Sequence, residues 1–279
     1  MRKHFQHFTL AMLFVLPGIV CSAQTELEIQ SSNRPMNLDI TGPVYQAGSN
    51  EASADFQENS LPGMLDFIDQ NLNETQSLND VSGVSLDPAK LYLNTVADVQ
   101  VYFLGEGAGY HNTLGFTTDG IGLEGTNPEL IFPDASSYDS WYTEGNTTQG
   151  YRSESYPLLP GDYVDLGTMD AATQLDFFLI ANGANGGRDV YTAHDQYNPD
   201  GIQHVVSYAL EGSPYLIIGF EDLYGGGDQD YNDLVFAVDI GYRNVQTLAN
   251  PEPATWMTLG LVLGLIFLFK RRQSATVKP

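Results

Sequence analysis

The chain has 279 residues and a formal net charge of −24, and its length allows one large domain or two small ones with a packed core. All 35 acidic residues lie between Gln24 and Pro253, accompanied there by only five basic residues. A surface this negative repels phosphate backbones and excludes nucleic-acid binding, whereas it attracts divalent cations and favours solubility.

Residues 1–23 have the pattern of a secretory signal peptide. Two basic residues precede a short apolar stretch at Thr9–Val20, and small residues stand just before Gln24. Acylation of Cys21, as in a bacterial lipoprotein, is the alternative, but the residues before it do not match that signal. Cleavage before Gln24 removes Cys21, the only cysteine, and so excludes disulfides and thiolate metal sites from the mature chain.

Residues 24–80 are expected to form a polar, loosely attached N-terminal arm. The segment is rich in Ser, Asn, Gln and Glu, and its apolar residues are scattered. Within it, "GMLDFIDQNL" places Met64, Leu65, Ile68 and Leu72 at helical spacing, which predicts one short helix.

Residues 81–245 show short β-rich stretches separated by turn residues. "ADVQVYF" alternates, with Val99, Val101 and Phe103 on one face and Tyr102 with two polar residues on the other. "LDFFLIA", "HVVSYAL", "YLIIGF" and "LVFAVDI" are further candidate strands, and Gly, Asn, Asp and Pro cluster between them. The pattern predicts an all-β fold, an antiparallel β-sandwich or jelly roll.

The stretch Asp134–Tyr163 is rich in aromatic residues among small polar ones. Aromatic faces stack on sugar rings, so Trp141 and Tyr142 are candidate sugar contacts. The alternative is that these rings pack on the edges of the sandwich with their polar tips in water.

Outside the acidic loop described next, no catalytic arrangement stands out by its spacing. His111 and His204 lack the close spacing of a metal-binding pair, and His204 is expected to satisfy backbone groups near the Asp200–Gly201 turn. Glu106 is a candidate for a carboxylate pair of the kind that hydrolyses glycosides. We therefore predict a non-catalytic module, with a hydrolase of extracellular polysaccharide as the alternative.

The most distinctive stretch is "GFEDLYGGGDQDYNDLVFAVDIG", Gly219–Gly241, with six acidic residues and no basic one. β-rich runs flank it, which predicts a hairpin. Asp228, Asp230 and Asn232 alternate as D-x-D-x-N with Asp233 next, so that their oxygens can converge on a hard cation. The three preceding glycines allow a sharp bend.

These features predict one Ca²⁺ site. Every donor in the loop is an oxygen, which favours Ca²⁺ over Zn²⁺ or copper. The loop is not an EF-hand, because Asp233 stands where that loop needs glycine and the flanks are strands. The alternative is a solvated acidic turn. The predicted ligands are Asp228, Asp230, Asn232 and Asp233, helped by Glu221 or Asp222.

"GFEDLYGGGDQDYNDLVFAV" resembles the bacterial family called domain of unknown function 4114. "GEGAGYHNTLGF", "FFLIANG" and "NPDGIQHV" match in the expected order, so that the resemblance spans Val99–Gly241. It implies a secreted β-rich module, often part of large surface proteins and associated with calcium binding. It implies no established enzyme activity.

The C-terminal segment, 246–279, resembles a PEP-CTERM sorting signal. Pro251, Glu252 and Pro253 precede an apolar run at Ala254–Phe269, and a basic cluster follows at once: Lys270, Arg271 and Arg272. The positive-inside rule places the cluster in the cytoplasm and the acidic body outside. The resemblance implies an exosortase-type membrane protease, a Gram-negative host and an exopolysaccharide at the cell envelope. A plain single-pass anchor is the alternative.

Overall fold

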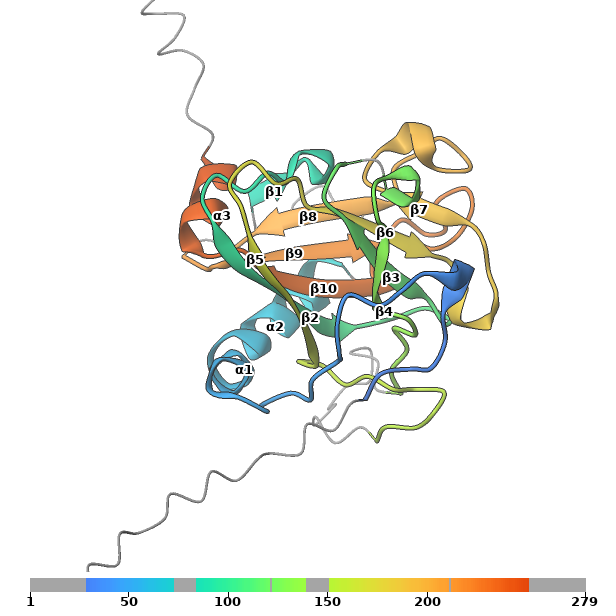
Figure 1. Cartoon of the computed structure of the whole chain (residues 1–279), viewed down its shortest axis with the longest axis horizontal. Helices are drawn as coiled ribbons and strands as arrows, with labels where there is room; N and C mark the ends of the chain where they lie inside the picture. The colour runs from blue at the N-terminus through green and yellow to red at the C-terminus, as the bar shows by residue number, and fades with distance from the viewer. Residues whose placement is uncertain (1–28, 73–83, 121, 139–150, 211, 251–279) are drawn as a thin grey trace, which may run out of the picture.

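Ten strands form two sheets in the computed structural model, which describes residues 29–72, 84–120, 122–138, 151–210 and 212–250 (Figure 1). Several predicted features lie outside these residues: the signal peptide, Trp141, Tyr142, the sorting motif Pro251–Pro253, the apolar run Ala254–Phe269 and the basic cluster Lys270–Arg272. None of the helices in the described ranges is long and apolar enough to span a bilayer.

The larger sheet has the strand order β1-β8-β9-β10-β2-β5. Its strands are β1 (Val84–Leu86), β2 (Ala97–Gly105), β5 (Tyr163–Met169), β8 (Val205–Ala209), β9 (Tyr215–Phe220) and β10 (Leu234–Asp239). The smaller sheet has the order β4-β3-β6-β7, with β3 (Thr113–Thr117), β4 (Glu129–Phe132), β6 (Asp176–Ile180) and β7 (Val190–Thr192). All neighbours pair antiparallel, which confirms the predicted antiparallel all-β class.

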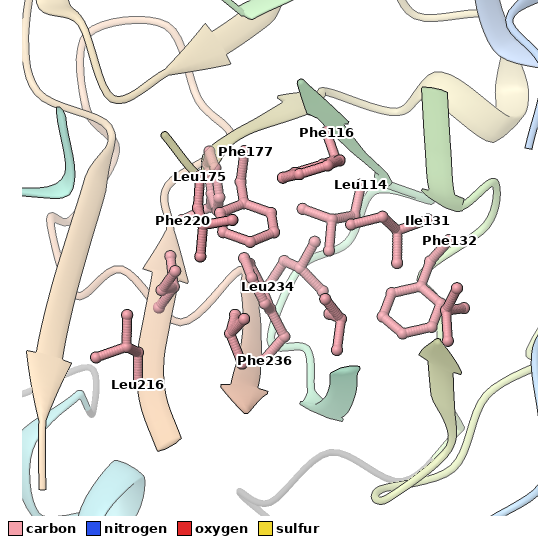
Figure 2. Close-up of a cluster of buried hydrophobic side chains, with 14 of the residues drawn as sticks. Leu114, Phe116, Ile131, Phe132, Leu175, Phe177, Leu216, Phe220, Leu234 and Phe236 are labelled. Atoms are coloured by element: carbon pink, nitrogen blue, oxygen red, sulfur yellow. The ribbon is translucent and has the colours of Figure 1, made fainter. Parts of the chain in front are cut away.

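The main core lies between the two sheets, as in a β-sandwich. In β2, Val99, Val101 and Phe103 belong to this core, so the face predicted from their alternation is the inner one. Figure 2 shows side chains of β3 and β4 gathered with those of β9 and β10, including Phe116 and Phe236. Burial of these apolar surfaces is the main stabilising term for such a fold.

The outer face of the larger sheet is covered by the N-terminal segment. There, α1 (Glu51–Asp55), the π-helical turn η2 (Phe56–Ser60) and α2 (Leu61–Asn71) follow one another below the sheet (Figure 1). Six of its apolar residues are buried against the sheet: Phe56, Leu61, Met64, Phe67, Ile68 and Leu72. Phe56 stacks on Tyr102 with ring centroids 3.9 Å apart.

A helix therefore lies where the spacing predicts one, but the expectation of a loosely attached arm is wrong. The reason is that few apolar residues are needed when the sheet supplies the rest of the interface. The tyrosines on the outer face of the sheet, such as Tyr102 and Tyr208, bury their rings against α2 and η2. Composition alone underestimates how firmly such a segment packs, because it takes no account of the apolar sheet surface that the segment covers.

The chain also covers the smaller sheet and one end of the core. Met36, Leu38 and Ile40 pack against a cluster on the outer face of β4 and β6. At the other end of the described chain, α3 (Tyr242–Ala249) packs against the main core through Val245, Leu248 and Ala249. The predicted boundary at residue 245 thus falls inside a helix. Short 3-10 helices are η1 (Pro35–Asn37), η3 (Pro88–Lys90), η4 (Gly122–Glu124), η5 (Gly183–Asn185) and η6 (Asp195–Tyr197).

Candidate metal centre

The acidic loop connects β9 to β10, and the register Phe220↔Leu234 makes the pair a hairpin, as predicted. The neighbouring strands bring other loops to the same end of the sandwich. The Gly107 N–H donates to the Asn232 carbonyl at 3.1 Å, and the Glu221 N–H donates to the His204 carbonyl at 2.9 Å. The loop 221–233 is therefore held between the segment after β2 and the segment before β8.

Five carboxylates of the loop form two groups that share one member. Oxygens of Glu221, Asp228 and Asp230 lie within 4.8 Å of one another, and so do oxygens of Glu221, Asp222 and Asp233. Glu221 is only 1% exposed, and Asp222 and Asp230 are also buried, whereas Asp228 is exposed. The structure thus brings together every carboxylate that the sequence analysis selected.

Asn232 has a different contact pattern from the acids. Its side-chain Nδ2 donates to the Leu72 carbonyl at 2.9 Å and to Asp230 Oδ2 at 2.5 Å. The amide thereby connects the end of α2 to the loop and orients Asp230. Direct coordination of an ion by Asn232 stays a prediction.

The backbone of the loop is left-handed at alternate positions. Gln229 has φ 63° and Tyr231 has φ 57°, so a left-handed residue follows Asp228 and another follows Asp230. Non-glycine residues in this region are strained by about 1–3 kcal/mol each and persist only where the surroundings hold them. At Gly227, φ is +44°, and a Cβ there would overlap with Glu221 Oε1. The loop backbone therefore crosses directly over the shared carboxylate.

Asn112, from a distant segment, orients Asp222 and is itself held by the backbone of Asn182. Asn112 donates through Nδ2 to Asp222 Oδ2 at 2.6 Å, and its Oδ1 accepts from the Asn182 N–H at 2.9 Å. The Asp222 N–H in turn donates to Asp233 Oδ2 at 2.8 Å. Sequence reasoning missed Asn112 and Asn182, and only the occurrence of Asn112 in the "GYHNTLGF" stretch pointed to it.

His204 joins the base of the loop to its glycine-rich part. Its Nδ1 donates to the Glu221 carbonyl at 2.9 Å, and its Nε2 lies 2.9 Å from Asp200 Oδ2. That same carboxylate oxygen accepts from the Gly225 N–H at 2.6 Å. The ring also stacks on Tyr191 with centroids 3.8 Å apart. His204 is therefore a supporting residue near the Asp200–Gly201 turn, but its partners are the Glu221 backbone carbonyl and the Asp200 carboxylate, not the backbone of that turn.

Burial is the main cause that raises the pKa values of four of the carboxylates, and neighbouring acidic charges raise those of Glu221, Asp230 and Asp233 further. Burial, followed by the charges of Asp222 and Glu221, raises the pKa of Asp233 to about 9. Burial and the charges of Asp228 and Glu221 raise the pKa of Asp230 to about 6. Burial also raises the pKa values of Glu221 and Asp222. Two carboxylate charges at this separation repel by roughly 3 kcal/mol at an effective dielectric constant of about 20.

Within the described part of the chain, none of the five carboxylates forms an ion pair with Lys or Arg. Glu221 Oε2 is buried and no hydrogen-bond donor reaches it. A buried carboxylate oxygen without a partner is costly, and a bound cation removes that cost. The donor set, made only of oxygens, fits a hard cation such as Ca²⁺.

A separate acidic pair lies beside this cluster. Burial, together with the charges of Asp134 and Asp222, raises the pKa of Glu106 to about 7. Asp134 faces His111, whose Nδ1 is 3.5 Å from Asp134 Oδ2. Near His111, the rings of Tyr138, Tyr151 and Tyr156 form an aromatic cluster, and Tyr138 and Tyr151 are exposed with centroids 4.5 Å apart.

Fold and site together define a class, the two-sheet antiparallel β protein with a buried carboxylate cluster in one hairpin. Residues 169–241 match the family described as Domain of unknown function (DUF4114), and the acidic hairpin ends the matched segment. The resemblance found in the sequence is thereby confirmed for this part of the chain, which is shorter than the span from Val99 that the sequence analysis assigned to it. Comparisons with curated proteins and with solved structures found no match.

Proposed function

We propose that the chain is an exported, non-catalytic β-rich module whose acidic hairpin binds Ca²⁺. Its role is structural or adhesive, at the cell surface or in an exopolysaccharide matrix. The observation that supports this best is Glu221 Oε2, a buried acceptor without a donor, in a cluster with four further carboxylates, none of which pairs with Lys or Arg in the described ranges. Calcium accepts about six to eight oxygen ligands in a flexible geometry, which suits an oxygen-only loop in an extracellular setting.

In this proposal the ligands are the carboxylates of Glu221, Asp222, Asp228, Asp230 and Asp233, with carbonyls of the glycine-rich turn and water completing the shell. Asn112, Asn232 and His204 hold the ligands in place through the hydrogen bonds described above. Extracellular sites work with dissociation constants on the order of 0.1–1 mM. Calcium at ~100 times that constant adds about 2.7 kcal/mol to the free energy of unfolding.

The experiment is thermal unfolding of the full chain with Ca²⁺ and with a chelator. The melting temperature is expected to rise with Ca²⁺, and Asp230→Ala is expected to remove most of that rise. Asp66→Ala, an exposed acid on α2, is the matched control and keeps the response. An unchanged melting curve under chelation, with no heat of binding at millimolar Ca²⁺, would show that the loop is a solvated turn.

The proposed location rests on the two ends of the sequence. The signal peptide and the order of Pro251–Pro253, the apolar run and the basic cluster support export followed by processing at an exosortase-type protease. Mass spectrometry of the native protein should then find a start near Gln24 and the loss of 254–279. Recovery of the intact Lys270–Arg272 cluster from the envelope would contradict processing and favour a single-pass anchor.

Exopolysaccharide is the proposed partner of the aromatic cluster. Tyr138 and Tyr151 expose neighbouring rings on one side of the molecule, an arrangement that suits stacking on sugars. Trp141 and Tyr142 remain predicted contacts in the same stretch. Tyr138→Ala is expected to weaken retention of the protein on the host polysaccharide. Equal retention of the wild type and the variant would exclude Tyr138 from the contact.

The alternative function, hydrolysis of that polysaccharide, is favoured by one observation. Glu106 is buried beside Asp134 with a raised pKa of about 7, which is what a general acid needs. We nevertheless expect no release of reducing ends. Steady release that Glu106→Gln abolishes would establish the hydrolase.

A further inference from the structure

The geometry points to two Ca²⁺ ions in the hairpin, bridged by the carboxylate of Glu221. The inference rests on the proposed calcium function and changes its stoichiometry and its central ligand. One ion would take Glu221, Asp228 and Asp230, and the other would take Glu221, Asp222 and Asp233.

The first argument is distance. Calcium ligands lie about 2.3–2.6 Å from the ion, so two oxygens on one ion are separated by at most about 5 Å. Each group of three meets this limit, since its ligand atoms lie within 4.8 Å of one another. The five carboxylates do not meet it as one set. Asp228 and Asp230 join Glu221 in one group, whereas Asp222 and Asp233 join it in another.

The second argument is the position of Glu221 itself. It is the only residue common to both groups, and it is 1% exposed. A carboxylate has two oxygens and about four lone-pair directions, enough for an ion on either side. Its Oε2 has no hydrogen-bond partner, although the buried acids around it do. An unpartnered oxygen on the one residue common to both groups is expected of a bridging ligand.

The third argument is charge. The five carboxylates carry five negative charges when ionised, and no Lys or Arg in the described ranges pairs with them. One Ca²⁺ leaves a large negative excess in a largely buried cluster, whereas two come close to neutralising it. The hydrogen bonds also divide the cluster in this way. Asn232 orients Asp230 in one group, and Asn112 orients Asp222 in the other.

The test is the number of Ca²⁺ ions bound by the full chain, measured by calorimetric titration with calcium alone and by native mass spectrometry. The wild-type chain is expected to bind two. Asp228→Asn removes the charge of a ligand of the first group only, and Asp233→Asn that of a ligand of the second group only. Each variant should therefore keep one binding event of wild-type affinity and weaken the other. Both changes keep the shape of the side chain, and Asp66→Asn is the charge-matched control that should still bind two.

Glu221→Gln distinguishes a bridge from two independent sites. It is expected to weaken both binding events by at least tenfold, whereas loss of a single event would overturn the bridging role. A wild-type stoichiometry of one would overturn the two-ion inference and leave the calcium function standing. No calcium binding at all would overturn the calcium function and, with it, this inference. If a variant fails to fold, the number of Ca²⁺ ions bound by the wild-type chain still decides between one ion and two.

Discussion

Gly227 is the residue at which the hairpin backbone comes closest to the shared ligand. Its φ of +44° disfavours any side chain, and a Cβ would overlap with the Glu221 carboxylate. Gly227→Ala is therefore expected to displace Glu221 and to weaken Ca²⁺ binding by at least tenfold. Isothermal titration of the variant with Ca²⁺ measures this directly.

Gly225→Ala is the matched control for that substitution. Gly225 has φ +87°, but nothing lies within 4 Å of a Cβ there. The Gly225→Ala variant should therefore lose about 1–2 kcal/mol of unfolding free energy through backbone strain and keep its affinity for calcium. Equal affinities for the two variants would mean that the contact with Glu221 has no role in binding.

The raised pKa values of the loop acids predict an unusual pH dependence. A carboxyl group whose pKa is higher in the folded than in the unfolded chain stabilises the fold below its ordinary pKa, near 4. That stabilisation is lost as the pH rises through the folded value, which is about 6 for Asp230 and about 9 for Asp233. In chelator, the melting temperature should therefore fall from about pH 4 to pH 9, with Asp230 contributing up to about pH 6 and Asp233 up to about pH 9.

Calcium is expected to reduce this fall, because the ion replaces the proton as the partner of the carboxylates. Scanning calorimetry across that pH range, with and without Ca²⁺, compares the two slopes. Asp233→Asn should flatten the upper part of the chelator curve. Parallel curves with and without calcium would argue against coordination by these acids.

Among the elements, α2 supports the loop directly: it packs against the larger sheet, and the Leu72 carbonyl at its end accepts a hydrogen bond from Asn232. Ile68 is fully buried against the outer face of the larger sheet, whereas Leu65 on the same helix is only partly buried. Ile68→Ala is expected to cost about 2–5 kcal/mol of unfolding free energy, the range for a buried aliphatic side chain. Urea unfolding should show a smaller loss for Leu65→Ala. Equal stability of wild type and Ile68→Ala would indicate that the helix is not part of the fold.

The strands and the acidic hairpin were predictable because their signals are local. Alternation in "ADVQVYF" and the D-x-D-x-N spacing each occupy a few consecutive residues, and the structure contains both β2 and the carboxylate groups there. The pairing of Asn112 with Asp222 and of Asn232 with Leu72 joins residues more than a hundred positions apart. No pattern within a segment encodes such contacts. The same is true of Phe56, whose burial depends on a sheet formed later in the chain.

At the scale of the whole molecule, the net charge of −24 means that part of any calcium effect is general screening. Sodium chloride at 0.1 M screens exposed charges beyond about 10 Å, but buried carboxylates within 4.8 Å of one another are screened far less. We therefore expect NaCl to raise the melting temperature modestly. Millimolar Ca²⁺ at the same ionic strength should raise it further. Mg²⁺ should do less, because it demands octahedral geometry and gives up water reluctantly.

Asp230→Ala separates the two contributions in a single protein. The variant should keep the response to NaCl, which depends on the charge of the whole surface. It should lose a large part of the response to Ca²⁺, because one of the two ligand groups of the loop loses a member. Melting curves of wild type and variant in matched NaCl, MgCl₂ and CaCl₂ solutions provide the measurement. Should NaCl of equal ionic strength reproduce the entire calcium effect in the wild type, the carboxylates of the hairpin act only as part of a negative surface.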